Sequence, residues 1–318
     1  MNKNENKFLL SAVIACYNDE KAIPIMHERL TSVFNKINCD YEIIFVCDGS
    51  PDNSEKILKE ICDQDKKTIA IIHSRNFSSQ NSFSSGMKIA SGDAVILLDG
   101  DLQDPPEIIE KFVEKWKQGY DIVYGRRVKR EVGFFLGVAY KLFYRIFNKL
   151  SYIKVPHDAG DFSLIDKKAY KNIQSFPEKD IFIRGLRAWV GFKQVGVNYV
   201  RPERLFGKST NNVLKNIRWA KKGIFSFSNA PLELISYLAI FVVFLSVIAM
   251  MFYIITFFVY PDVPRGFTTM FVLILFLGGV QLLSISIISE YIGKIIEETK
   301  DRPKFIIDKI YNDPKNKK

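Results

Sequence analysis

Two carboxylates, Asp99 and Asp101, stand one residue apart directly after the apolar run at residues 94–98. The run is short, uncharged and prone to β structure, which predicts a buried strand. In open α/β sheets the ligand sites lie at the carboxyl ends of the strands, so the two carboxylates are expected at such an edge. Oxygen ligands of this kind suit Mg²⁺ or Mn²⁺ held against a diphosphate. The competing interpretation is a turn rich in Asp and Gly that leads into a helix at Pro105-Pro106.

The elements that would position this pair alternate between strand and helix patterns. We expect strands at residues 8–16, 41–47, 68–74, 94–98 and 121–124, and helices at residues 20–37, 52–65, 79–90 and 105–118. This alternation predicts right-handed crossovers and a mostly parallel, Rossmann-like α/β sheet. Polar groups that follow the strands, such as Asp48 after the second one, are then expected along the same edge as the acidic pair.

The composition adds a membrane component. The chain has 318 residues, of which 47% are hydrophobic, and it carries a net charge of +10. No charged side chain occurs in residues 234–260 or 266–289, and each run exceeds the roughly 20 residues that cross a bilayer core. The link at residues 261–265 is too short for a domain. We therefore expect a transmembrane hairpin with spans at residues 232–260 and 266–289, after a globular domain at residues 1–210.

The basic residues indicate how this hairpin is oriented. Lys and Arg cluster before the first span and in the tail at residues 290–318, so the positive-inside tendency places both termini and the sheet in the cytoplasm. Lys and Arg also accompany aromatic residues in the segments at residues 131–155 and 211–231, which favours anionic lipid over nucleic acid. We expect residues 211–231 to form a juxtamembrane amphipathic helix. Residues 131–155 read equally well as an interfacial helix or as a core helix with one solvated stripe. The four cysteines show no metal-ligand spacing, and we expect them to be reduced and buried.

Several short motifs, taken in order, resemble the family 2 glycosyltransferases with a GT-A fold. The resemblance is to the polyprenyl-phosphate branch, related to bactoprenol glucosyltransferases and dolichol-phosphate mannose synthase. The motifs are Tyr17-Asn18-Asp19-Glu20, Asp48-Gly49-Ser50-Pro51-Asp52, Arg75-Asn76-Phe77, Asp99-Gly100-Asp101-Leu102-Gln103-Asp104, Gly160-Asp161-Phe162 and Trp189-Val190-Gly191-Phe192.

The resemblance implies an activity and its partners. The activity is an inverting transfer of a hexose, such as glucose, from a UDP-sugar to undecaprenyl or another polyprenyl phosphate, with Mg²⁺ or Mn²⁺ as the cofactor. It serves the modification of cell-surface glycans such as lipopolysaccharide, at the cytoplasmic face of the bacterial inner membrane. The resemblance also implies a homotetramer, in which the tail after Arg302 touches a neighbour, and a lipid-sugar flippase as a further partner.

The resemblance assigns roles residue by residue. Nucleotide-sugar binding falls to Tyr17, Asn18, Glu20, Asp48, Arg75, Asp99 and Gly100. Metal binding falls to Asp99 and Asp101, with Gln103 and Asp104 organising their loop. The acceptor phosphate is assigned to Arg127, Arg201, Arg204, Lys208 and Ser209, and the catalytic residues are Asp101, Arg127 and Asp161.

Asp161 is the family's candidate base, but the chemistry of the acceptor suggests another role. The second pKa of a phosphate monoester is about 6, so a lipid phosphate is already a dianion in the cytoplasm. Asp161 can therefore serve to orient the acceptor or to stabilise positive charge that develops on the sugar.

Departures from the family pattern leave alternatives open. Ala15, Cys47 and the pair Ser78-Ser79 stand where the family often has Pro, a polar Asp or Asn, and Gly-Lys, and the acceptor loop also differs. These differences leave donor specificity and acceptor contacts undecided. One alternative is transfer to a hydroxyl of another lipid or glycan, for which Asp161 would be an indispensable base. Another is a non-catalytic membrane protein that binds nucleotide-sugars, which would have no need of the acidic pair.

Overall fold

The structure is a computed structural model that describes residues 8–128, 156, 159–206, 228–259 and 266–314. The chain divides into two compact units. The first unit contains the sheet and takes in the carboxyl-terminal residues from Asp301 onward, and the second contains two long helices.

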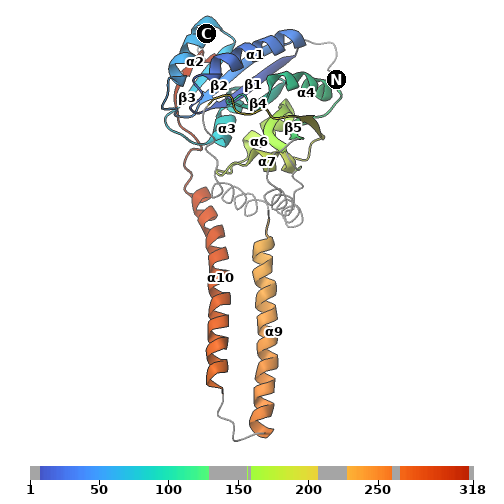
Figure 1. Cartoon of the computed structure of the whole chain (residues 1–318), viewed down its shortest axis with the longest axis vertical. Coiled ribbons are helices and arrows are strands. Elements are labelled where there is room, and N and C mark those ends of the chain that lie inside the picture. The colour runs from blue at the N-terminus through green and yellow to red at the C-terminus, as the bar shows by residue number, and fades with distance from the viewer. Residues whose placement is uncertain (1–7, 129–155, 157–158, 207–227, 260–265, 315–318) are drawn as a thin grey trace. The chain divides into compact units, whose positions relative to one another are not determined.

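The first unit contains an eight-stranded sheet (Figure 1). Its strand order is β7-β5-β6-β4-β1-β2-β3-β8. The strands are β1 (Leu9–Cys16), β2 (Asp40–Cys47), β3 (Thr68–His73), β4 (Ala94–Asp99), β5 (Ile122–Arg127), β6 (Ala159–Asp166), β7 (Gln194–Tyr199) and β8 (Ile307–Tyr311). The five strands expected from the sequence are present, with small shifts at their ends, whereas β6, β7 and β8 were not predicted. The mostly parallel α/β class is confirmed.

The strand directions gather the polar loops at one edge. β1 pairs in parallel with β2 and β4, β2 pairs in parallel with β3, and β5 pairs in parallel with β7. β6 lies antiparallel between β4 and β5. The carboxyl ends of the six parallel strands therefore lie at the same edge of the sheet as the start of β6. Asp161 is the third residue of β6, so it lies at the edge that also carries Asp48 and Asp99.

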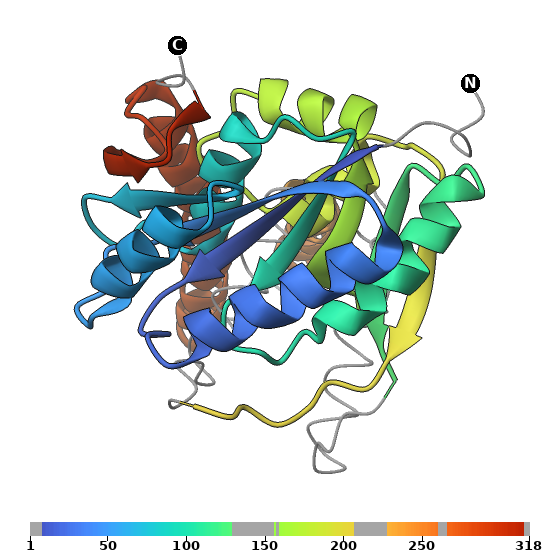
Figure 2. The same cartoon turned by 90° about the horizontal axis from the view of Figure 1, so that it is seen from above.

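Helices cover both faces of the sheet (Figure 2). The helices are α1 (Ala22–Ile37), α2 (Ser54–Gln64), α3 (Ser79–Ile89), the 3₁₀ helix η1 (Pro106–Ile108), α4 (Ile109–Lys117), α6 (Lys167–Ser175) and α7 (Ile183–Trp189). Successive residues of a strand point to opposite faces. Accordingly, Leu10 and Ile14 of β1 join the core beneath α1, α2 and α4, while Val13 packs against Gly86 of α3.

The residues after the second long helix return to the sheet. β8 pairs antiparallel with β3 of the same sheet. The contact with a neighbouring subunit that the resemblance implies for this segment stays a prediction. Lys309 Nζ and Tyr311 Oη each lie 2.9 Å from Glu55 Oε1. Asn312 Nδ2 donates to three carbonyls, at Cys62, Asp65 and Thr68. Glu55 and Asn312 therefore fix the position of β8 at the edge of the sheet.

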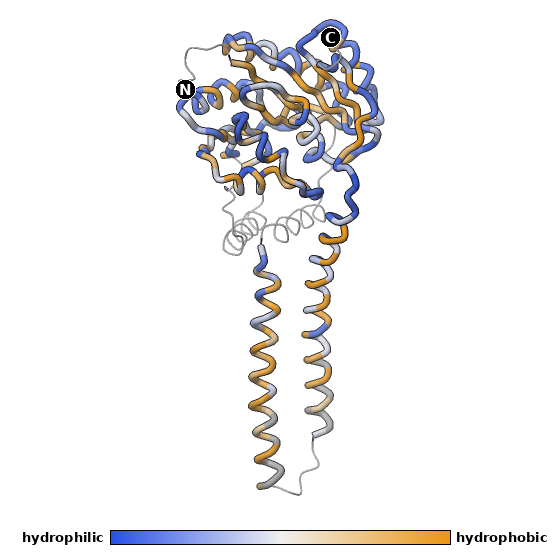
Figure 3. The backbone as a smooth tube through the Cα atoms, turned by 180° about the vertical axis from the view of Figure 1, so that it is seen from behind, coloured by the Kyte–Doolittle hydropathy of each residue, from blue (hydrophilic) through white to orange (hydrophobic). Residues whose placement is uncertain are grey.

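The second unit contains α9 (Ala230–Val259) and α10 (Phe267–Thr299), which contact each other. The mean hydropathy is 2.5 over Ala230–Ala249 and 1.4 over Phe276–Thr299, so both helices are long and apolar enough to cross a membrane. Figure 3 shows that hydrophobic residues predominate along both helices. α10 continues to Thr299, beyond the predicted end of the second span at residue 289.

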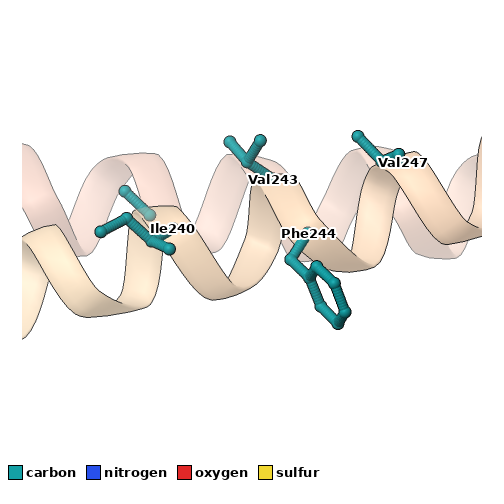
Figure 4. A pocket seen from close by; sticks show the side chains of 5 residues that line it. Ile240, Val243, Phe244 and Val247 are labelled. Atoms are coloured by element: carbon teal, nitrogen blue, oxygen red, sulfur yellow. The ribbon is translucent and has the colours of Figure 1, made fainter.

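A shallow hollow on α9 is lined by Ala239, Ile240, Val243, Phe244 and Val247. Val243 and Val247 project from one side of the helix and Phe244 from the opposite side (Figure 4). All five side chains are apolar, so this hollow can contact lipid or another helix but has no group for chemistry. The predicted amphipathic helix at residues 131–155, most of residues 211–231, Lys208, Ser209 and the link at residues 261–265 lie outside the described residues.

Candidate active site

Asp48 is the buried acidic group that follows β2. Its side chain is only 4% exposed, and its Oδ1 atom accepts hydrogen bonds from the Phe77 backbone N–H and from His73 Nδ1, both at 2.8 Å. In the part of the chain that the structure describes, no hydrogen bond reaches Oδ2 of Asp48. A carboxylate oxygen of this kind can accept a hydrogen bond from a ligand.

The loop after β1 is tied to the loop after β2. The Asn18 backbone N–H donates to Ser50 Oγ at 3.1 Å. Glu20 Oε2 accepts from the backbone N–H of Asn53 at 3.1 Å and from Asn53 Nδ2 at 3.0 Å. Glu20 therefore holds the start of α2, a structural role that sequence analysis did not assign to it. Tyr17 is 40% exposed and available to a ligand beside these loops.

Arg75 follows β3 at the same edge. Its guanidinium lies 4.1 Å from the centre of the Phe77 ring, and its Nη1 donates to the Asn76 carbonyl at 3.0 Å. Gly49 has a φ of +62° and lies so close to the Arg75 backbone that a Cβ atom would collide with it. Glycine is therefore required where these two loops meet.

The acidic loop after β4 concentrates negative charge. Burial, together with the neighbouring Asp104, Asp101 and Asp161, raises the pKa of Asp99 to about 8. Gly100 brings this loop close to the end of β1, because its backbone N–H donates to the Ala15 carbonyl at 2.9 Å. A group of carboxylates that holds a proton this tightly is stabilised by a cation.

Asp99 and Asp101 offer the oxygen ligands that a divalent metal takes. Among the described residues there is no group of three or more His, Cys, Asp or Glu side chains that could enclose one. Mg²⁺, however, is usually held by one or two carboxylates together with substrate phosphates and water. Asp99 and Asp101 therefore fit a metal that is shared with a diphosphate, and the raised pKa of Asp99 fits a site that gains from positive charge.

Two arginines after β7 pair with the acidic loop. Arg204 Nη2 lies 2.6 Å and Arg201 Nη2 lies 3.6 Å from Asp101 Oδ2. Gln103 Nε2 donates to the Pro202 carbonyl at 3.2 Å, which also ties the two loops together. The predicted acceptor-phosphate arginines therefore lie against a predicted metal ligand.

Asp104, Tyr199 and Arg127 form a connected network. Tyr199 Oη donates to Asp104 Oδ1 at 2.6 Å and accepts from Arg127 Nε at 3.2 Å. Burial and the adjacent Asp104 carboxylate raise the pKa of Tyr199, which keeps its hydroxyl protonated as a donor. This network fixes Arg127 beside the acidic loop.

Asp161 is held by an arginine that the sequence analysis missed. Arg184 of α7 donates from Nε to Oδ1 at 3.0 Å and from Nη2 to Oδ2 at 2.9 Å. Burial alone would raise the pKa of Asp161, but Arg184, together with Arg187 and Gln80, outweighs this effect, and the pKa is lowered. The fully buried Arg187 donates to the Gly160 carbonyl at 3.2 Å and so supports the start of β6.

The structure thus brings twelve predicted site residues to one edge of the sheet, contributed by six strand-end loops and the start of β6. It adds His73, Arg184 and Tyr199, which sequence reasoning did not select. His73 ends a strand directly before the Arg75 motif, and Arg184 precedes the Trp189 motif by five residues. Their closeness to these motifs is the only hint in the sequence that His73 and Arg184 belong to the site. It does not show that His73 contacts Asp48 or that Arg184 contacts Asp161.

Comparison with known proteins identifies the family. Residues 11–174 match the family described as Glycosyl transferase family 2, and residues 230–295 match the GtrB C-terminal hairpin. A glycosyltransferase of Synechocystis is 41% identical over 305 residues, which cover 95% of each chain. The bactoprenol glucosyl transferase of Shigella phage SfII is 38% identical over 301 residues, which cover 94% of this chain and 97% of the relative.

This chain belongs to glycosyl transferase family 2, and it is a glycosyltransferase. The family resemblance, the enzyme class and the carboxyl-terminal helical hairpin expected from the sequence are confirmed. Among solved structures, glucosyl-3-phosphoglycerate synthase from Mycobacterium tuberculosis shares 16% identity, with a TM-score of 0.45 over 69% of this chain and 78% of that chain. A likeness at this level carries no information about substrate.

Proposed function

We propose that this enzyme transfers a hexose from a UDP-sugar to a polyprenyl phosphate, with inversion at the anomeric carbon. The observation that carries the proposal is the meeting of the acidic pair Asp99 and Asp101 with Arg127, Arg201 and Arg204 at one sheet edge. Relatives named bactoprenol glucosyl transferase, which match across nearly the whole chain, support the lipid acceptor.

The donor is assigned to the loops after β1, β2 and β4. Asp48 accepts the N3–H of uracil, and Tyr17, Asn18 and Arg75 border the nucleoside. A divalent cation bound by Asp99 and Asp101 would neutralise the charge that grows on the departing diphosphate. Gly100 lets the acidic loop lie close to the end of β1, because a side chain here would meet Cys16 Sγ and the Ala15 carbonyl.

The lowered pKa of Asp161 favours a phosphate acceptor over a hydroxyl acceptor. A hydroxyl needs a general base whose pKa lies near the working pH, whereas Arg184 lowers the pKa of Asp161. A phosphate dianion needs no base. Its oxygen attacks the anomeric carbon, the bond from that carbon to the diphosphate oxygen breaks, and UDP leaves with the electron pair. Arg127, Arg201 and Arg204 hold the acceptor phosphate.

We place the enzyme in the bacterial cytoplasmic membrane, with α9 and α10 as the spanning hairpin and with the sheet and both termini in the cytoplasm. The uncharged segments of both helices and the basic tail support this placement. A homotetramer and a flippase that accepts the lipid-linked sugar complete the proposal, on the strength of the family resemblance.

The test is a transfer assay with the purified full-length protein, labelled UDP-glucose, undecaprenyl phosphate and Mg²⁺. The expected product is a labelled lipid that mild acid hydrolyses, because a glycosyl phosphodiester is acid-labile. Its formation should stop with EDTA and with Asp99→Asn. Transfer to a neutral lipid or glycan hydroxyl, but not to undecaprenyl phosphate, would contradict the proposed acceptor, and a screen of other UDP-sugars under the same conditions identifies the hexose.

A further inference from the structure

His73 controls the orientation of the Asp48 carboxylate. Its Nδ1 lies 2.8 Å from Asp48 Oδ1, and its Nε2 lies 2.9 Å from Ser85 Oγ. The His73 side chain is fully buried, so water does not compete for either contact. Because both ring nitrogens have partners, the imidazole is fixed in its plane and the carboxylate is fixed with it.

Phe305 supports this imidazole from the side. The two rings are stacked, with their centres 5.5 Å apart and an angle of 10° between their planes. The Phe77 ring meets His73 edge-on at 5.7 Å and 87°. His73 is therefore packed between two aromatic rings, and one of them comes from the segment that follows α10. Aromatic pairs in such arrangements are stabilising beyond their buried area.

The carboxyl-terminal segment is held so that Phe305 stays in place. The Ser74 backbone N–H donates to the Ile306 carbonyl at 3.0 Å, and Lys304 Nζ donates to the Phe176 carbonyl at 2.8 Å. These contacts lie on either side of Phe305 in the sequence. Further along, β8 is paired with β3.

We propose that Phe305 is a positioning residue for recognition of the nucleobase. It acts through His73, which orients Asp48 so that one carboxylate oxygen is occupied by protein donors and the other is left for the base. This inference rests on the proposed UDP-sugar donor. Residues of the first unit that follow the second long helix thereby contribute to how tightly the site binds its nucleotide.

The proposal makes a prediction about base selectivity. The carboxylate only accepts hydrogen bonds, so it favours uracil, whose N3 carries a hydrogen, over cytosine, whose N3 is itself an acceptor. Without the Phe305 ring, His73 and Asp48 lose their fixed orientation. Affinity for UDP should fall while affinity for CDP changes little, so the ratio of the two affinities decreases.

The experiment measures UDP and CDP binding to the full-length protein by calorimetry with Mg²⁺ present. We expect Phe305→Ala and Phe305→Leu to weaken UDP binding roughly three- to tenfold, the loss expected for one misaligned hydrogen bond. Phe305→Tyr keeps the ring and should restore both the affinity and the UDP preference. The matched control is Ile306→Ala, because Ile306 is the adjacent residue and its side chain is 51% exposed.

A second measurement separates positioning from loss of structure. Binding linkage is reciprocal, so UDP should slow amide hydrogen exchange at residues 305–311 in the wild type and less so in His73→Gln. Unchanged UDP affinity and unchanged base preference in both Phe305→Ala and Phe305→Leu would overturn the inference while leaving the proposed function intact. A wild-type protein that binds no uridine nucleotide would overturn both.

Discussion

Arg184 holds both carboxylate oxygens of Asp161, through contacts of 3.0 Å and 2.9 Å, at the point where β6 begins. The Arg184 side chain is 29% exposed and that of Asp161 is 9% exposed, so the pair lies partly within the protein but can be reached from the site. An ion pair of this geometry keeps Asp161 ionised and limits its use as a base. It defines Asp161 as a fixed negative charge beside the acidic loop.

The first prediction concerns the relative importance of the carboxylates. Asp161→Asn should lower turnover roughly tenfold, while Asp99→Asn or Asp101→Asn should lower it roughly a hundredfold or more, because only the latter two change residues to which we assign the metal. Initial rates with UDP-glucose and undecaprenyl phosphate measure the turnover of each variant. The double variant Asp161→Asn with Arg184→Gln controls for the loss of the ion pair between these two side chains. A larger loss for Asp161→Asn than for Asp99→Asn would show that Asp161 is a true base.

The second prediction concerns the pH dependence of stability. The folded, metal-free protein raises the pKa of Asp99 from 3.8 to about 8 and so binds this proton more tightly than the unfolded chain. The resulting stability is complete below about pH 4 and is lost as the pH rises towards about 8. Between about pH 5 and pH 8 in EDTA, the unfolding temperature of the wild type should therefore fall more than that of Asp99→Asn.

Tryptophan fluorescence during heating provides this measurement. Adding Mg²⁺ with UDP at about pH 8 should raise the unfolding temperature of the wild type and have little effect on Asp99→Asn, since binding stabilises only a competent folded state. If the unfolding temperatures of the two proteins in EDTA change with pH in the same way, the pKa of Asp99 is not raised in the folded protein.

The third prediction concerns Arg204, which lies 2.6 Å from Asp101 Oδ2. Its positive charge competes with a metal for the same carboxylate. Arg204→Ala should therefore raise the affinity for Mn²⁺ in the absence of donor by roughly three- to tenfold. The same variant should lower turnover, because we assign Arg204 to the acceptor phosphate.

Electron paramagnetic resonance of free Mn²⁺ measures the first effect, and the transfer assay measures the second. Arg126→Ala removes an equal charge from an exposed position on β5 and serves as the control. Weaker Mn²⁺ binding by Arg204→Ala would mean that this arginine supports the metal site rather than competing with it.

The fourth prediction concerns topology. All four native cysteines are buried, so single cysteines can be introduced and labelled selectively. In intact cells, a membrane-impermeant maleimide should label Asp262→Cys in the link between the helices and spare Lys317→Cys in the tail. After the cells are permeabilised, both should react. Labelling of Lys317→Cys in intact cells would place the tail outside and refute the proposed orientation.

Features formed by residues that are neighbours in the sequence could be predicted from the sequence. The apolar run of β4 leads directly into Asp99 and Asp101, so the strand pattern also located the acidic pair. β6 was missed because Gly160, Asp161 and Ser163 interrupt its apolar pattern, although every residue of the strand is buried between β4 and β5.

Contacts between distant residues could not be predicted. Arg184 lies 23 residues from Asp161, and Arg204 lies 103 residues from Asp101. His73 and Phe305 come from the first and last quarters of the chain. Each pair depends on the order of strands in the sheet, and no local propensity specifies that order. The placement of Lys208 and Ser209 stays a prediction.

The pairing of β8 with β3 has a practical consequence for any shortened form of this enzyme. Truncation ahead of α9 removes the hydrophobic hairpin but also strips away β8, so β3 becomes an open edge with unpaired backbone groups. Such edges recruit strands from other molecules and promote aggregation. A well-behaved water-soluble version should keep residues 301–314, rejoined to the sheet through a flexible linker in place of the hairpin.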